Sequence, residues 1–156
     1  MRRRRLLITL AALVLLVPLV LIPLTEVEAG RMHELYLDDA EVVLEGSGNP
    51  NLFGEATIEA NGGQGRLCYT MRAFIYGFDE DVTGVAIHEA PPGVKGPQRA
   101  HLASSIEEGT TVSDCVFIGR TLAHDIQHNP ENYYLLVTTT DYPDGASRAQ
   151  LSKGGK

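Results

Sequence analysis

The pattern of apolar and polar positions divides the chain into a long apolar run near its start and a remainder of short alternating segments. Alternation is clearest over residues 54–60, where Ala56 and Ile58 are separated by polar residues, and over residues 66–75. A period of two residues is the pattern of a half-buried strand. We therefore expect a β-rich domain that follows a separate apolar segment.

Gly, Pro, Asn and Asp residues separate the alternating segments and mark their ends. One helix is expected over residues 121–128, with Thr121 as its cap and Asn129-Pro130 at its end. Many short, regularly spaced strands are typical of an antiparallel sandwich or barrel. The expected strands are residues 35–37, 41–44, 54–60, 66–75, 82–88, 99–103, 114–118, 133–140 and 146–151.

The apolar run from Leu6 to Leu24 follows a block of four arginines, Arg2 to Arg5. A basic flank followed by an apolar run directs a segment into the export machinery. Small residues at Val27 and Ala29 suit a signal peptidase, but the run is also nearly long enough to cross a bilayer. We expect residues 1–29 to be a signal peptide or a membrane anchor, residues 30–151 a single domain, and residues 152–156 a polar tail.

The charge of the exported part limits its partners. Residues 1–29 hold 4 of the 13 basic residues and only 2 of the 20 acidic ones, so the rest carries about −9. Nucleic acids and anionic lipid surfaces require a basic patch. We therefore expect no nucleic acid partner and no membrane contact except through the N-terminal helix. The expected partner is a protein or a component of the cell envelope.

Two cysteines, Cys68 and Cys115, fall within expected strands. In an exported chain a single pair favours a disulfide, expected here to join two sheets, although two free buried thiols are the alternative. A bridge that closes a loop of this length stabilises a fold by about 4 kcal/mol on the chain-entropy model. Neither cysteine has a neighbouring Cys or His at the spacing of a zinc site.

Several motifs in the second half occur in the order typical of the CHRD domain, named after chordin and found in many exported microbial proteins. The chain resembles this family from about Phe53 to Leu151, and the resemblance implies an all-β, immunoglobulin-like or superoxide-dismutase-like antiparallel Greek-key sandwich with one short helix. Bacterial members commonly carry a cysteine pair where Cys68 and Cys115 stand. The matching segments are Val85-Ala86-Ile87-His88, residues 93–97, residues 129–138 and residues 143–151.

The chain departs from the family pattern at histidine positions. Where the family usually has His-x-His, this chain has Ala86 and His88, and Thr138 stands where a further histidine is usual. Strand positions two apart share a face, so three such histidines would be able to chelate a transition metal. With His88 alone, we expect no metal and no cofactor. A metal-dependent redox enzyme of dismutase-like fold and a small-ligand carrier remain alternative hypotheses.

His88 and Glu89 are the candidate binding residues, because they end a strand before the proline-rich loop, where sandwiches often present functional side chains. The alternative for His88 is a hydrogen bond to that loop's backbone. His124 and His128 share a helix face, which suits either zinc or simple capping of the helix end. Alternation also predicts that one of Tyr133 and Tyr134 is in the core and the other at the surface.

Acidic residues at 38–39 and 79–81 suit either a calcium site or ordinary solvated turns. No nucleophile elbow and no phosphate-binding loop is found in the sequence, so no catalytic residue is predicted. We therefore expect a non-catalytic extracytoplasmic module, secreted or anchored, that binds a partner or serves a structural role.

Overall fold

The computed structural model describes residues 48–76 and 80–152, together with the backbone of residues 31–37. In order along the chain the elements are β1 (Arg31–Leu37), β2 (Leu52–Asn61), β3 (Arg66–Ile75), β4 (Val82–Glu89), β5 (Gln98–Ala103), β6 (Val112–Phe117), α1 (Arg120–His128), a 3₁₀ turn η1 (Pro130–Asn132), β7 (Tyr133–Thr139) and β8 (Ser147–Gln150).

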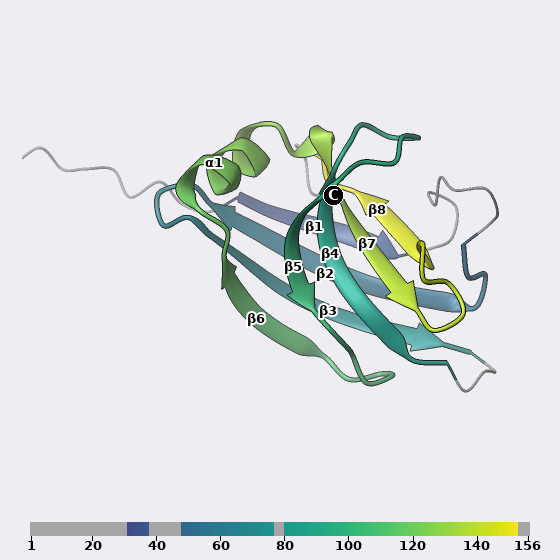
Figure 1. The fold of residues 1–156 in the computed structure, drawn as a ribbon. Coiled ribbons are helices and arrows are strands. Elements are labelled where there is room, and N and C mark those ends of the chain that lie inside the picture. Colours follow the sequence, from purple (N-terminus) through teal and green to yellow (C-terminus); the bar gives the residue numbers. More distant parts are fainter. Residues whose placement is uncertain (1–30, 38–47, 77–79, 153–156) are drawn as a thin grey trace, which may run out of the picture.

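The strands form two sheets, and every neighbouring pair is antiparallel (Figure 1). The first sheet has the order β1-β2-β3-β6 and the second has the order β5-β4-β7-β8. The chain therefore crosses between the sheets after β3, β5 and β6. This confirms the expected antiparallel two-sheet arrangement with one short α-helix. The expected strand at residues 41–44 and the N-terminal segment 1–29 lie outside the described residues. Within the described ranges, no helix is long and apolar enough to cross a membrane.

The core lies between the two sheets, and the alternation in the sequence determines which side chains enter it. In β2, Ala56 and Ile58 are buried, while Glu55 is exposed and Glu59 is only partly covered. The Tyr69 hydroxyl on β3 donates to the Leu102 carbonyl on β5 at 2.9 Å, which satisfies a buried polar group. The other large buried residues include Leu67, Met71, Val85, Ile87, Leu135 and Val137.

Helix α1 packs against the end of the first sheet, near the β2–β3 turn (Figure 1). The buried side chain of Gln127 accepts a hydrogen bond from the Gly62 backbone at 2.9 Å, and Ile126 enters the core. The expectation that Thr121 caps the helix is wrong. Gly119, with φ of 85°, precedes the first helical residue, and no side chain caps the end. The helix therefore begins at Arg120, one residue before the predicted cap, and the positive φ at residue 119 favours glycine.

The disulfide between Cys68 and Cys115 is confirmed, but its predicted position across two sheets is wrong. The two residues are register partners on β3 and β6 of the first sheet, with their Cα atoms 3.9 Å apart. Their side chains face outward, because Cys68 alternates with the buried Leu67 and Tyr69. The bridge therefore ties an edge strand to its neighbour on the outer surface of one sheet.

Candidate binding site

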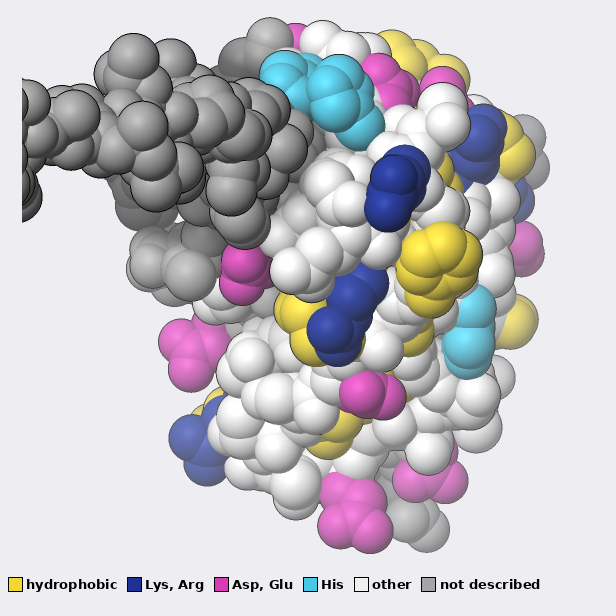
Figure 2. Space-filling model, turned by 90° about the vertical axis from the view of Figure 1, so that its left-hand side faces the viewer, with side chains coloured by type: hydrophobic (Ala, Val, Ile, Leu, Met, Phe, Trp, Pro, Cys, Tyr) yellow, Lys and Arg dark blue, Asp and Glu magenta, His cyan; other side chains and the backbone are white. Residues whose placement is uncertain are grey.

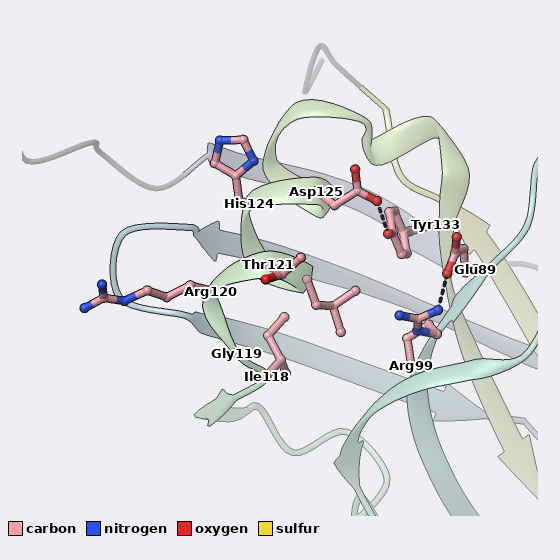
Figure 3. Close-up of a pocket in the computed structure, with 10 residues that line it drawn as sticks. Glu89, Arg99, Ile118, Gly119, Arg120, Thr121, His124, Asp125 and Tyr133 are labelled. Carbon is pink, nitrogen blue, oxygen red and sulfur yellow. Dashed lines mark hydrogen bonds and ion pairs between the residues drawn. The ribbon is translucent and has the colours of Figure 1, made fainter.

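An open hollow of about 510 Å³ lies between α1 and the adjoining ends of β4, β5 and β7 (Figure 3). On the face of the molecule that carries α1, basic and acidic side chains are interspersed with hydrophobic ones (Figure 2). Residues from several elements line the hollow: Glu89, Arg99, Ile118, Gly119, Arg120, Thr121, Leu122, His124, Asp125 and Tyr133.

Two polar pairs lie next to each other along one side of the hollow (Figure 3). Arg99 on β5 forms an ion pair with Glu89 at the end of β4, with 2.6 Å between Nη1 and Oε2, and both side chains are partly exposed. The Tyr133 hydroxyl donates to Oδ2 of Asp125 on α1. Oδ1 of Asp125 accepts from the Asn129 amide at 2.8 Å.

These contacts separate the pKa values of Asp125 and Tyr133. The hydrogen bond from Tyr133, followed by that from Asn129, lowers the pKa of the Asp125 carboxyl. Burial, and then the hydrogen bond to Asp125, raises the pKa of the Tyr133 hydroxyl. Asp125 is therefore anionic and Tyr133 protonated throughout the neutral range, so the pair is a fixed hydrogen bond between a donor and an acceptor.

The remaining lining adds both polar and apolar surface. Thr121 and Arg120 are exposed in the first turn of α1, and Ile118 and Leu122 are half-buried. Arg120 and His124 point away from the two polar pairs (Figure 3). The hollow thus presents charged groups, a hydroxyl and aliphatic carbon together.

The two predicted binding residues face different surroundings. Glu89 lines the hollow, whereas His88 lies outside it. Nδ1 of His88 is 3.0 Å from the Gly96 carbonyl, and its ring stacks on Tyr134 with 5.2 Å between centroids. His88 thus bonds the backbone of the proline-rich loop, which was the alternative interpretation. A binding role for Glu89 stays a prediction.

The expectation that either Tyr133 or Tyr134 is a surface residue is wrong, because both are buried, 1% and 2% exposed respectively. Tyr134 lies beneath Arg148, whose guanidinium carbon is 3.6 Å from the centre of the ring. Arg148 also donates to the Val94 carbonyl at 2.8 Å and the Pro91 carbonyl at 2.9 Å. The proline-rich loop therefore folds back over the second sheet and covers a side chain that alternation places on the outside.

Gln150 has a similar structural role two residues further along β8. Its amide nitrogen is 3.0 Å from the Ala90 carbonyl, 2.8 Å from that of Glu131 and 2.9 Å from that of Tyr133. Its side-chain oxygen accepts from Arg148 at 2.8 Å. The last matching segment, residues 143–151, thus joins two loops to the second sheet.

The histidines on α1 stack on each other with 4.0 Å between ring centroids, and Nδ1 of His128 is 2.8 Å from the His124 carbonyl. This contact at the end of the helix agrees with the interpretation that these histidines cap the helix. In the part of the chain that the structure describes, no three His, Cys, Asp or Glu side chains gather where one metal ion would bind. Residues 38, 39 and 79 of the proposed calcium site lie outside the described residues, and Glu80 accepts from Asn49 at 2.7 Å.

The histidine positions of the family pattern lie on β4 and β7. Ala86 pairs with Leu136, His88 with Tyr134, and Thr138 with Gly84. Positions 86, 88 and 138 therefore share one face of the second sheet, the outer one, as the spacing of two residues along a strand predicts for 86 and 88. Ala86 and Thr138 offer no imidazole at this face.

Sequence reasoning did not find Arg99 or the Tyr133–Asp125 pair as parts of a site. Arg99 reaches Glu89 only because residues 91–97 return the chain beside β4, and Asp125 reaches Tyr133 only through the path of α1 and η1. The available signal was weak: a charged residue on each side of a Gly/Pro loop. Each pair is brought together by the path of the segment between its two residues, and that path depends on the tertiary fold.

The fold and the hollow define a disulfide-bonded β-sandwich domain with a polar site at one end of its sheets. The family model described as the CHRD domain matches residues 35–151, which is most of the chain. The chain therefore belongs to the CHRD domain family, as its motifs predicted. No curated protein matches the chain, and no solved structure does.

Proposed function

We propose that this CHRD domain protein is a non-catalytic extracytoplasmic module that binds a protein or envelope component in the hollow beside α1. The observation that carries this proposal is the hollow itself, where groups from α1, β4, β5 and β7 converge on one open site. The disulfide favours a location outside the cytoplasm, because such bonds persist in oxidising compartments.

The ionisation of Asp125 and Tyr133 favours binding over catalysis by this pair. A general acid or base works best when its pKa lies near the ambient pH. The pKa of Asp125 is lowered and that of Tyr133 is raised, so both move away from neutrality. Glu89, the other carboxylate of the hollow, is engaged by Arg99. These groups are suited to holding a ligand by hydrogen bonds.

Other features support the finer predictions about fold and attachment. Strands β3 and β6 are neighbours, as are β4 and β7, and these non-consecutive pairs favour a dismutase-like Greek-key sandwich. The apolar run at residues 6–24 supports export, followed either by secretion or by retention of the segment as an anchor.

Site-specific photo-crosslinking in the producing cells tests the binding role. A photoreactive residue at Thr121, exposed on the rim of the hollow, should form adducts with envelope material. The same residue at Lys95, exposed on the proline-rich loop, is the matched control. The double substitution of Glu89 and Arg99 by glutamine should abolish the Thr121 adducts. Adducts that form equally at both positions, or that persist in the double variant, would contradict a site in the hollow.

A turnover assay addresses the non-catalytic part of the proposal. Purified full-length protein should leave esters, phosphoesters, glycosides and superoxide unchanged beyond the background rate. Turnover of any of these that disappears on substitution of Asp125 by asparagine would show an enzyme. Stoichiometric copper or zinc in protein purified without chelator would favour the redox alternative.

A further inference from the structure

The charged groups beside the two polar pairs are already engaged within the protein. Arg99 and Glu89 neutralise each other directly at 2.6 Å. The Asp125 carboxylate accepts two hydrogen bonds from neighbouring side chains. Arg120 also lines the hollow, but it points away from the two pairs (Figure 3). A charged ligand of either sign would therefore meet a like charge at the Arg99–Glu89 pair, together with an opposite charge that already has a partner.

The hollow is nevertheless rich in directional hydrogen-bonding groups. Arg99 uses Nη1 on Glu89, and a guanidinium group has five N–H donors in a planar fork. The carboxylates of Glu89 and Asp125 accept, and the exposed Thr121 hydroxyl both donates and accepts. A hydroxyl-rich ligand matches this mixture, because each of its hydroxyl groups can donate to a carboxylate and accept from a guanidinium.

The apolar part of the lining fits the same chemistry. Ile118 and Leu122 are half-buried and present aliphatic carbon beside the polar pairs. A pyranose ring combines hydroxyl groups at its edge with a face of C–H groups, which can bury against such carbon. The hollow is open to solvent, so a ring within a longer chain can enter it without a free end.

We propose that the hollow binds an uncharged, hydroxyl-rich glycan, an inference that rests on the proposed binding function and specifies its ligand class. Arg99 and Glu89 form a donor and acceptor pair for adjacent hydroxyl groups. Asp125, held anionic by Tyr133 and Asn129, is a second acceptor. Thr121 contacts the ligand from the first turn of α1.

Isothermal titration calorimetry with full-length protein, in a detergent without a sugar headgroup, tests this proposal. The probes are three neutral series, namely malto-, cello- and chito-oligosaccharides, with oligogalacturonate as the anionic probe and deacetylated chitosan oligosaccharide as the cationic one. We expect at least one neutral series to bind, with an affinity that hardly changes between low and high sodium chloride, because screening acts on charged partners.

Three variants locate the binding. Arg99→Gln should weaken it about tenfold or more, and Thr121→Val about two- to tenfold, because hydrogen bonds to charged and to neutral groups differ in strength. Lys95→Gln, which breaks an exposed ion pair with Asp144 outside the hollow, should leave it unchanged. Thr121→Val keeps the shape of an exposed side chain, so it remains informative if Arg99→Gln lowers stability.

Each outcome separates the ligand class from the binding function. Neutral binding that weakens in both hollow variants and not in Lys95→Gln supports the proposal. Binding to the charged probes alone, with strong salt dependence, overturns it. No glycan binding, while Thr121 crosslinks to envelope material persist, also overturns it but leaves the proposed function standing. If neither glycan binding nor Thr121 crosslinking is observed, both the proposed ligand class and the proposed binding site are refuted.

Discussion

Replacing Arg148 by lysine keeps a positive charge in the second sheet but removes the planar guanidinium. Arg148 is 2% exposed, and its guanidinium donates to Val94, Pro91 and Gln150 at distances of 2.8–2.9 Å. It also lies 3.6 Å from the centre of the Tyr134 ring. A single ammonium nitrogen lacks the fork geometry that reaches these acceptors together. The substitution therefore separates the effect of shape from that of charge.

The structure sets the size of the effect. Loss of at least one hydrogen bond from a charged donor costs about 1.5–3 kcal/mol. A weaker cation–π contact with the ring adds about 0.5–1 kcal/mol. We expect a loss of about 2–4 kcal/mol in the free energy of unfolding, or about 5–12 °C in Tm for a chain of this size. Thermal and urea unfolding followed by circular dichroism measure both quantities.

Hydrogen exchange tests whether the loss is local. The Glu89 amide donates to the Pro97 carbonyl at 3.0 Å, and the Gly96 amide donates to the Tyr134 hydroxyl at 3.1 Å. Relative to the wild type, Arg148→Lys should accelerate exchange more at these two amides than at the amides in the centre of β4 and β7, because the loop is released first.

The control for this variant is Lys95→Ala, in the same loop. Lys95 and Asp144 are both largely exposed, so this substitution should change stability by less than about 1 kcal/mol. If Arg148→Lys is as stable as the wild type, or if exchange increases uniformly, Arg148 does not hold the loop.

Gly96→Ala should destabilise the fold by several kcal/mol in urea unfolding, because its Cβ would overlap the Glu89 carbonyl, whereas Gly93→Ala meets no neighbouring atom and should cost only about 1–2 kcal/mol for its positive φ. Alkylation without reductant should leave the intact mass unchanged, and serine at both cysteines should lower stability by about 4 kcal/mol, since the bridge spans 47 residues; two alkylated thiols in the native protein would refute the bridge. Tyr133→Phe should lower the free energy of unfolding by about 1–3 kcal/mol at neutral pH. Because the pKa of Asp125 is lowered in the fold, the stability from this contact is present above pH 4 and is lost as the pH falls through the folded pKa. The difference in stability between the wild type and Tyr133→Phe should therefore narrow as the pH falls below 4, and a difference that does not change with pH would contradict the contact.

Much of the fold was predictable because strand alternation is a local property. The expected strand 66–75 matches β3 at both ends, and its alternate side chains, Leu67, Tyr69, Met71 and Ala73, are buried. The end of α1 at Asn129-Pro130 was predicted for the same reason, since proline cannot continue a helix. The family assignment also came from short ordered motifs.

The site was only partly predictable. Glu89 was identified from its place at a strand end, but its partner Arg99 and the nearby Tyr133–Asp125 pair were not. The side chains of Tyr133 and Tyr134 alternate as predicted, yet both are buried. The covering of Tyr134 comes from a loop that Arg148 holds from more than fifty residues away.

The sequence by itself determined the periodicity of the strands, the turns between them, the position of the helix and the presence of a bridging cysteine pair. The strands, turns and helix depend on neighbouring residues, whose sterics and hydrogen bonding act within a few positions, whereas the bridge was expected from a single cysteine pair in an exported chain. The tertiary structure alone decided which strands pair, and so placed the disulfide within one sheet. It also brought α1 to the ends of β4, β5 and β7 to form the hollow, because packing joins segments that no local pattern connects.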